Sequence, residues 1–221
     1  MRRIFGESHW LYRFLSRAAD WMLLSVLWCI CSLPVITIGV STTALYFVML
    51  QLVRGEEPPI IKTYFRSCRV NLKQGLGLGV LVLLAVAVTI GDYYVYRMAD
   101  GFVRSLFAGF CMLSAGILLL ILPYLFPLLA QFDNTVWQMI KNSFVLSIAN
   151  LPITVFLLLI HAVPVVMLLI SWELVVRMLM ILLILAPAAI SYFCSKKINR
   201  IFEPLITPPE ISEAERMEPN N

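Results

Sequence analysis

The chain has 221 residues, of which 61% are hydrophobic and only 14% charged, and its mean hydropathy is +0.88. A soluble domain of this size has about a quarter of its residues charged. This composition excludes a water-soluble globular fold and predicts an all-α, polytopic bundle of membrane helices.

The chain begins with a basic lead-in that is followed by an uncharged apolar run over 21–53. This run is too long for a signal peptide and has no small-x-small cleavage site, so it is expected to stay in the protein. Its middle is polar and contains the candidate binding residues Pro34, Thr37, Gly39, Ser41 and Thr42. We call residues 34–42 the elbow.

The elbow predicts a break between two short membrane helices. Pro34 should end the first helix near Leu33, because proline lacks a backbone N–H and clashes with the preceding turn. Gly39 is expected to permit the turn, and Ser41 or Thr42 to cap the second helix. A helix over 42–53 would be about 18 Å long, which is short of the roughly 30 Å apolar core of a bilayer.

Further apolar runs indicate about six passes within a single transmembrane domain over 1–200. The expected passes cover 18–33, 42–54, 75–96, 105–130, 151–171 and 177–195. Six passes put all but three of the 17 lysines and arginines on one side, the exceptions being Arg97, Arg104 and Arg177. By the positive-inside rule, both termini are then cytoplasmic and the elbow lies near the outer face.

Two amphipathic helices are expected to lie at the cytoplasmic interface, over 60–74 and 134–150. On the first, four cations follow each other three or four residues apart and form the basic stripe Lys62, Arg66, Arg69 and Lys73. Such a stripe predicts contact with anionic lipids or docking of a cytoplasmic partner. Shifted by 79 residues, the first segment matches the second at five of twelve positions, which suggests a repeated unit of pass, interfacial helix and pass.

Candidate chemistry is sparse. His161 is the one ionisable residue in the middle of a predicted pass, where a polar group can be functional or can simply bond to a neighbouring helix. The five cysteines are scattered without a CxxC pair, so no metal site or disulfide framework is expected. We expect no cofactor, no nucleic-acid partner and no enzymatic activity, and we expect the Pro-rich, acidic tail over 203–221 to be disordered.

The segments "YRFLSRAADWMLLSVLWCICSLPVITIGVSTTALYFV", "LVRGEE" and "YFRSCRVNLKQ" resemble the YesL-type family of bacterial membrane proteins of unknown function. "YLFPLLAQFDN" and "IKNSFVLSIANLP" extend the resemblance over roughly 4–200. It implies a bacterial cell-membrane protein whose gene often lies beside genes for carbohydrate-uptake ABC transporters. The family has no established catalytic residues.

Two hypotheses follow. The first is a non-enzymatic accessory component of carbohydrate uptake, which meets lipid or transporter subunits through its interfacial helices. The second is a small transporter or permease-like protein with its site at the elbow. In either case the elbow could serve as a binding site or as a packing corner, and packing is the simpler interpretation.

Overall fold

The computed structural model describes residues 5–170 and 172–206, and within these ranges the fold is helical without a strand. The elements are α1 (Phe5–Cys31), the 3-10 turn η1 (Val35–Thr37), α2 (Ile38–Val53), α3 (Ile60–Val70), α4 (Leu72–Met98), α5 (Gly101–Gln131), α6 (Val136–Ala149), α7 (Leu151–Ile170) and α8 (Trp172–Ile206). The predicted all-α membrane bundle is confirmed.

Three segments among the described residues are long and apolar enough to cross a membrane: Val35–Val53, Leu72–Met98 and Gly101–Gln131. The bent pair of α6 with Leu151–Pro164, which turns through 105°, would make a fourth. These findings support several membrane helices, while the expectation of six passes stays a prediction.

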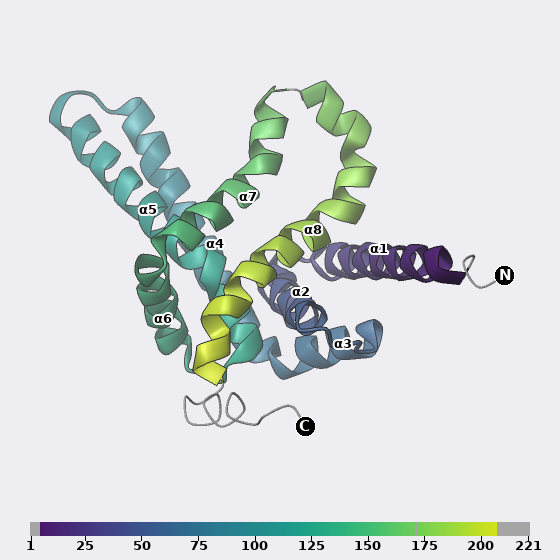
Figure 1. Ribbon diagram of the computed structural model, residues 1–221. Coiled ribbons are helices and arrows are strands. Elements are labelled where there is room, and N and C mark those ends of the chain that lie inside the picture. The colour runs from purple at the N-terminus through teal and green to yellow at the C-terminus, as the bar shows by residue number, and fades with distance from the viewer. Residues whose placement is uncertain (1–4, 171, 207–221) are drawn as a thin grey trace.

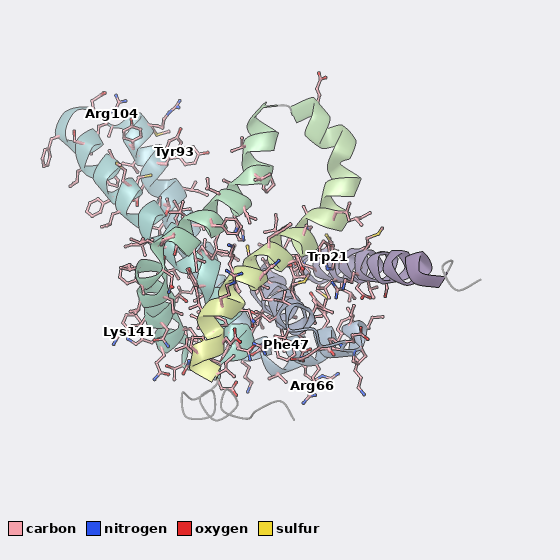
Figure 2. The ribbon with its side chains drawn as sticks, in the orientation of Figure 1. Trp21, Phe47, Arg66, Tyr93, Arg104 and Lys141 are labelled. Atoms are coloured by element: carbon pink, nitrogen blue, oxygen red, sulfur yellow. The ribbon has the colours of Figure 1, made fainter. Side chains whose placement is uncertain are left out.

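The long helices leave the bundle as two hairpins. Figure 1 shows α4 and α5 rising together to one side, while α7 and α8 form a second arm. Helices α3 and α6, which the sequence predicts to be interfacial, lie at the opposite end, together with the last turns of α8. Figure 2 places Tyr93 and Arg104 at the tip of the first hairpin, and Arg66 and Lys141 at the end where α3 and α6 lie. We call this end the α3/α6 face.

The tightest core lies near the α3/α6 face, where α2, α5 and α8 meet. Tyr46 and Leu50 of α2 pack there with Tyr124 of α5 and with Ile198 and Phe202 of α8, all of them buried. By contrast, the side chains along α4 and the first half of α5 are largely exposed. Apolar side chains can stay exposed in this way because a bilayer, rather than water, would surround them.

The break at the elbow agrees with the expected effect of Pro34, but the second helix is longer than expected. Helix α1 ends at Cys31 and α2 begins at Ile38, four residues before the predicted start at 42. The sixteen residues of α2 span about 24 Å, which is still less than the bilayer core. Ser41 and Thr42 therefore lie inside a helix and do not cap it.

Helices α3 and α6 are shorter than expected, and both end at an asparagine. They end just before Asn71 and Asn150, which correspond under the 79-residue shift. Each asparagine donates from Nδ2 to the carbonyl oxygen four residues earlier, to Ser67 at 3.2 Å and to Leu146 at 3.2 Å. The backbone N–H of the same asparagine donates to the same carbonyl at 3.0 Å, so the side chain adds a second bond at the helix end. The chain then turns directly into α4 or α7, so the same corner recurs at matching positions.

The first four residues of the predicted disordered tail are helical. Residues 203–206 continue α8, which ends at Ile206, and Phe202 just before them is completely buried. Burial of this ring against the core stabilises the last turn beyond what local composition suggests. The rest of the expected disordered tail, 207–221, lies outside the described residues.

Candidate functional site

The elbow is packed much closer to the α3/α6 face than expected. A Cβ atom added to Gly39 would lie 2.5 Å from the Gly75 carbonyl oxygen and 2.9 Å from the Gly79 Cα. Gly79 is only the eighth residue of α4, about 12 Å along the helix from its start. This contact joins the elbow to the early part of α4, while its position relative to the two membrane faces stays a prediction. Charge counting constrains the two ends of a helix pair and not the depth of the connection between them.

Gly39 has a different role from the one expected. It lies inside α2, and its missing side chain allows the backbone of α2 to touch that of α4. A close approach of this kind, mediated by small residues, is a known way for membrane helices to pack. Gly75 and Gly79, the ends of a GxxxG pattern, thus serve a contact within the chain.

The hydroxyl groups of the elbow bond to nearby parts of the chain. The Thr37 hydroxyl donates to the carbonyl oxygens of Cys31 at 2.6 Å and Pro34 at 2.7 Å. It thereby satisfies a carbonyl at the end of α1 that has no helical partner. Pro34 itself is exposed, as are its neighbours Leu33 and Val35. The tip of the elbow is therefore an apolar surface with its polar groups turned inward.

Ser41 and Thr42 join three helices. The Ser41 hydroxyl lies 2.7 Å from the Tyr64 hydroxyl of α3 and donates to the Trp28 carbonyl oxygen of α1 at 3.1 Å. The indole Nε1 of Trp28 donates to Thr42 Oγ1 at 3.1 Å. Ser41 and Tyr64 are buried, and buried polar groups need such partners. The candidate elbow residues are thus brought together as a bonded corner.

The structure divides the predicted basic stripe between two helices. Lys62, Arg66 and Arg69 lie on the exposed side of α3, whereas Lys73 lies beyond the break at Asn71, in the first turn of α4. All four side chains are exposed. Ile60, Tyr64 and Ser67 are buried on the opposite side and hold α3 against the bundle. Between these two sides, Ile61 and Phe65 present 52% and 47% of their surface. An interfacial helix is expected to have a charged side for headgroups and an exposed apolar edge for the acyl region.

His161 is bonded within its own helix. Its Nδ1 lies 2.7 Å from the carbonyl oxygen of Leu157, one turn earlier, and 4.0 Å from the Cys194 sulfur of α8. A neutral imidazole that donates to this carbonyl satisfies Nδ1 without any ligand. This geometry favours a structural histidine.

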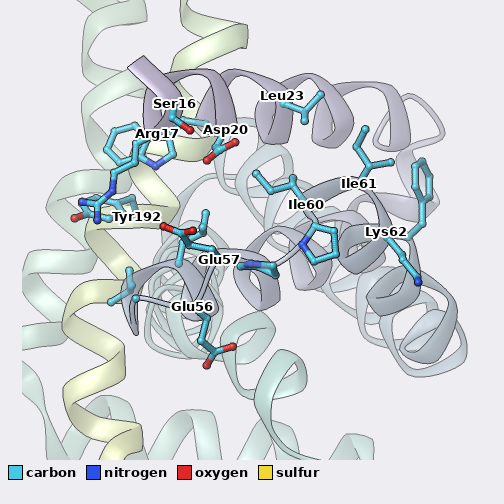
Figure 3. Close-up of a pocket in the computed structure, with 17 residues that line it drawn as sticks. Ser16, Arg17, Asp20, Leu23, Glu56, Glu57, Ile60, Ile61, Lys62 and Tyr192 are labelled. Carbon is cyan, nitrogen blue, oxygen red and sulfur yellow. The ribbon is translucent and has the colours of Figure 1, made fainter. Parts of the chain in front are cut away.

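A pocket of about 910 Å³, which the sequence did not predict, lies beside the middle of α1. It lies between Ser16–Leu23 of α1, the loop from Gly55 to Pro59, the first turns of α3, and Tyr192 of α8. Figure 3 shows the carboxylates of Asp20 and Glu57 turned toward the same space, with Arg17 beside them. The Glu56 carboxylate points away from Asp20.

One wall of the pocket is aromatic. The rings of Trp21 and Tyr192 lie 4.6 Å apart between centroids, and both line the pocket. The loop can pass beneath α1 because Gly55 has a φ of +83°, a value that glycine adopts without strain. The segment "RGEEPP" carried a sequence signal for this loop, since it combines a turn glycine with two acids and two prolines.

Arg54 lies just before this loop and has a structural role that the sequence did not predict. Its Nε donates to Asn199 Oδ1 at 3.0 Å, and its terminal nitrogen donates to Gln131 Oε1 at 2.7 Å. One guanidinium therefore links the ends of α2 and α5 to α8. These bonds lie next to the packed core and fix the α3/α6 face.

Comparisons with known proteins identify similar proteins without a known activity. Residues 21–93 match a family described as "Protein of unknown function, DUF624". The chain is also 28% identical over 158 residues to "Uncharacterized protein YteU" of Bacillus subtilis (strain 168), which covers 71% of this chain and 68% of that protein. Neither description names an enzymatic activity. No solved structure matches significantly.

Proposed function

We propose that the protein is a non-enzymatic component of the bacterial cell membrane that assists a carbohydrate-uptake system of the ABC type. Its contact surface would be the α3/α6 face, with both termini on the cytoplasmic side. The observation that carries this proposal is the α3 part of the basic stripe, Lys62, Arg66 and Arg69, which is exposed on a helix whose other side is held in the bundle.

The α3/α6 face has the features of a docking platform. Helix α6 adds Lys141 and Trp137, whose side chain is 74% exposed, at the end of the bundle that also carries Arg66. Tryptophan and arginine are enriched among the residues that contribute most to protein interfaces. The Arg54 bonds to α5 and α8 hold this surface in one geometry, which lowers the entropic cost of binding.

The partner class rests on the resemblance to YesL-type proteins, which implies proximity to sugar import. The experiment is affinity purification of the full chain in mild detergent from cells grown on different polysaccharides. We expect identified ABC permease or ATPase subunits to be recovered with it. Recovery of the bare protein under all these conditions would contradict the proposal.

A charge reversal makes this test specific. The double substitution R66E/R69E should remove the subunits, whereas R97E/R104E at the opposite end should retain them. Equal amounts of each variant in the membrane fraction would show that insertion is unaffected. If capture proved insensitive to the charge of the stripe, the α3/α6 face would not be the contact surface.

The transporter hypothesis receives less support from the geometry, because the elbow hydroxyls bond to the chain itself. Sugar uptake in a deletion strain separates the two functions. A transporter with its site at the elbow should lose uptake when Thr37 and Thr42 are replaced by valine and Ser41 by alanine. An accessory protein whose elbow is a packing corner should keep uptake as long as these variants still fold.

A further inference from the structure

We propose that the pocket beneath α1 binds the headgroup of an aminophospholipid, a lipid that carries a primary ammonium group next to a phosphodiester. This proposal does not depend on carbohydrate uptake or on any partner protein.

The first step is the position of the pocket. Its walls include Ile60–Lys62 and Phe65, at the start of the amphipathic helix α3. Helices with a basic side and an exposed apolar edge lie in the interface between headgroups and acyl chains. The pocket therefore opens at the depth where phospholipid headgroups are found.

The second step is the charge at one end of the pocket. Asp20 and Glu57 come from different elements, and their carboxylates face the same space (Figure 3). Two neighbouring carboxylates repel each other when both are ionised, and a cation between them relieves this repulsion. Arg17, one turn before Asp20, adds a guanidinium, the side chain best suited to phosphate. Two acids and one arginine complement an ammonium joined to a phosphate.

The third step is the apolar end. Leu23, Ile61 and Phe65 line the pocket and remain 38%, 52% and 47% exposed. In Figure 3, Leu23 and Ile61 lie together to one side of the Asp20 and Glu57 carboxylates. A water-soluble amine would leave these apolar side chains exposed to water, whereas the acyl chains of a lipid would cover them. The combination of a charged end and an apolar end favours an amphiphile.

The Asp20 and Glu57 carboxylates are better suited to bind an amine than a metal ion. Within the part of the chain that the structure describes, no group of three or more acidic, cysteine or histidine side chains is arranged to hold a metal. Two carboxylates with a nearby guanidinium form a poor metal site, because the arginine repels the ion. An ammonium donates up to three hydrogen bonds. It can therefore donate to both carboxylates and to one oxygen of the headgroup.

The test uses the purified full chain in detergent and four probes. These are short-chain phosphatidylethanolamine, phosphatidylglycerol and phosphatidylcholine, and water-soluble phosphoethanolamine. Native mass spectrometry and thermal stabilisation would report binding. We expect phosphatidylethanolamine to bind about tenfold more tightly than the other lipids, because only its ammonium can donate to both carboxylates.

Three results would overturn the proposal. Equal binding of phosphatidylglycerol would show that the amine is not recognised. Equal binding of phosphoethanolamine would identify a soluble ligand. Binding of none of the four probes would show that the pocket is not a headgroup site.

A glutamate outside the pocket supplies the control. E57Q and D20N should each weaken phosphatidylethanolamine binding about tenfold, whereas E203Q, at an exposed residue of α8 that does not line the pocket, should leave it unchanged. Unchanged unfolding temperatures without lipid would show that E57Q and D20N fold normally. An equal loss of binding in E203Q would mean that general surface charge, rather than the pocket, attracts the lipid.

Discussion

The hydroxyl oxygens of Ser41 and Tyr64 lie 2.7 Å apart, and this contact joins the first turn of α2 to the middle of α3. Both side chains are buried, and Ser41 also bonds to the Trp28 carbonyl oxygen. The elbow and the interfacial helix therefore form one unit. A change in the position of α3 would be transmitted to the corner between α1 and α2.

Replacement of Tyr64 by phenylalanine should loosen this unit without a change in shape. Y64F removes one buried hydrogen bond and leaves Ser41 bonded to Trp28, so we expect a loss of about 0.5–1.5 kcal/mol. Denaturant unfolding in mixed micelles would measure it. Y94F, at a tyrosine that is 60% exposed, is the control and should cost nothing measurable. An equal loss in both variants would contradict a special role for Tyr64.

Contact between α2 and α4 requires glycine at position 39. G39A places a methyl group 2.5 Å from the Gly75 carbonyl oxygen, and the two helices would have to separate. Overpacking of this kind costs about 1–3 kcal/mol, which thermal unfolding in detergent would detect. G77A is the matched control, because a Cβ atom there meets nothing within 4 Å. Equal stability of G39A and G77A would be inconsistent with the close contact.

The depth of the elbow can be tested by labelling. In a cysteine-free background, I36C should not react with a membrane-impermeant maleimide added outside intact cells, because Ile36 lies beside Gly79 in the early part of α4. D100C, in the turn between α4 and α5, should react, since that turn lies at the other end of the hairpin. Rapid labelling of I36C from outside would instead place the elbow at the outer face, as the charge count predicts.

Cys68 should be an unreactive thiol. Burial, followed by the nearby Cys31, raises the pKa of the Cys68 thiol to about 11. Below that pH the thiol stays protonated, so its rate of alkylation should be slow near neutral pH and rise as pH approaches 11. Maleimide kinetics of a chain with Cys68 as its only cysteine would measure this. R69C, on the exposed side of the same helix, should react rapidly at pH 8, and equal rates would refute the burial of Cys68.

Arg54 should hold the ends of three helices together. R54K keeps the charge but cannot donate to Asn199 and Gln131 in the same fork geometry. We expect faster proteolysis near residues 54–59 and 132–135. The free energy of unfolding should fall by only about 1 kcal/mol, because these hydrogen bonds are exposed to solvent. R69K, on the basic stripe, is the conservative control. Unchanged proteolysis in R54K would show that these bonds do not restrain the loops.

Local sequence was sufficient for the helical class, the break at Pro34 and the presence of helices within 60–74 and 134–150. Apolar runs and the three- and four-residue spacing of the stripe are properties of neighbouring residues, so they can be read without tertiary structure. The asparagines that end α3 and α6 were also visible, as part of the 79-residue match. The predicted helix ends were less accurate. Helix α2 begins at Ile38 and α8 continues to Ile206, because contacts with other helices extend them beyond what the local sequence indicates.

The sequence by itself determined that this chain belongs in a bilayer, since too few of its residues are charged to cover a soluble surface. Only the tertiary structure decided which part of α4 the elbow meets and that Asp20 faces Glu57 across a pocket. The contact with α4 depends on three glycines from two helices that fit together. The pocket depends on a loop passing beneath α1. Contacts between distant segments leave no periodic signal in either segment, and so they became visible only once the chain was folded.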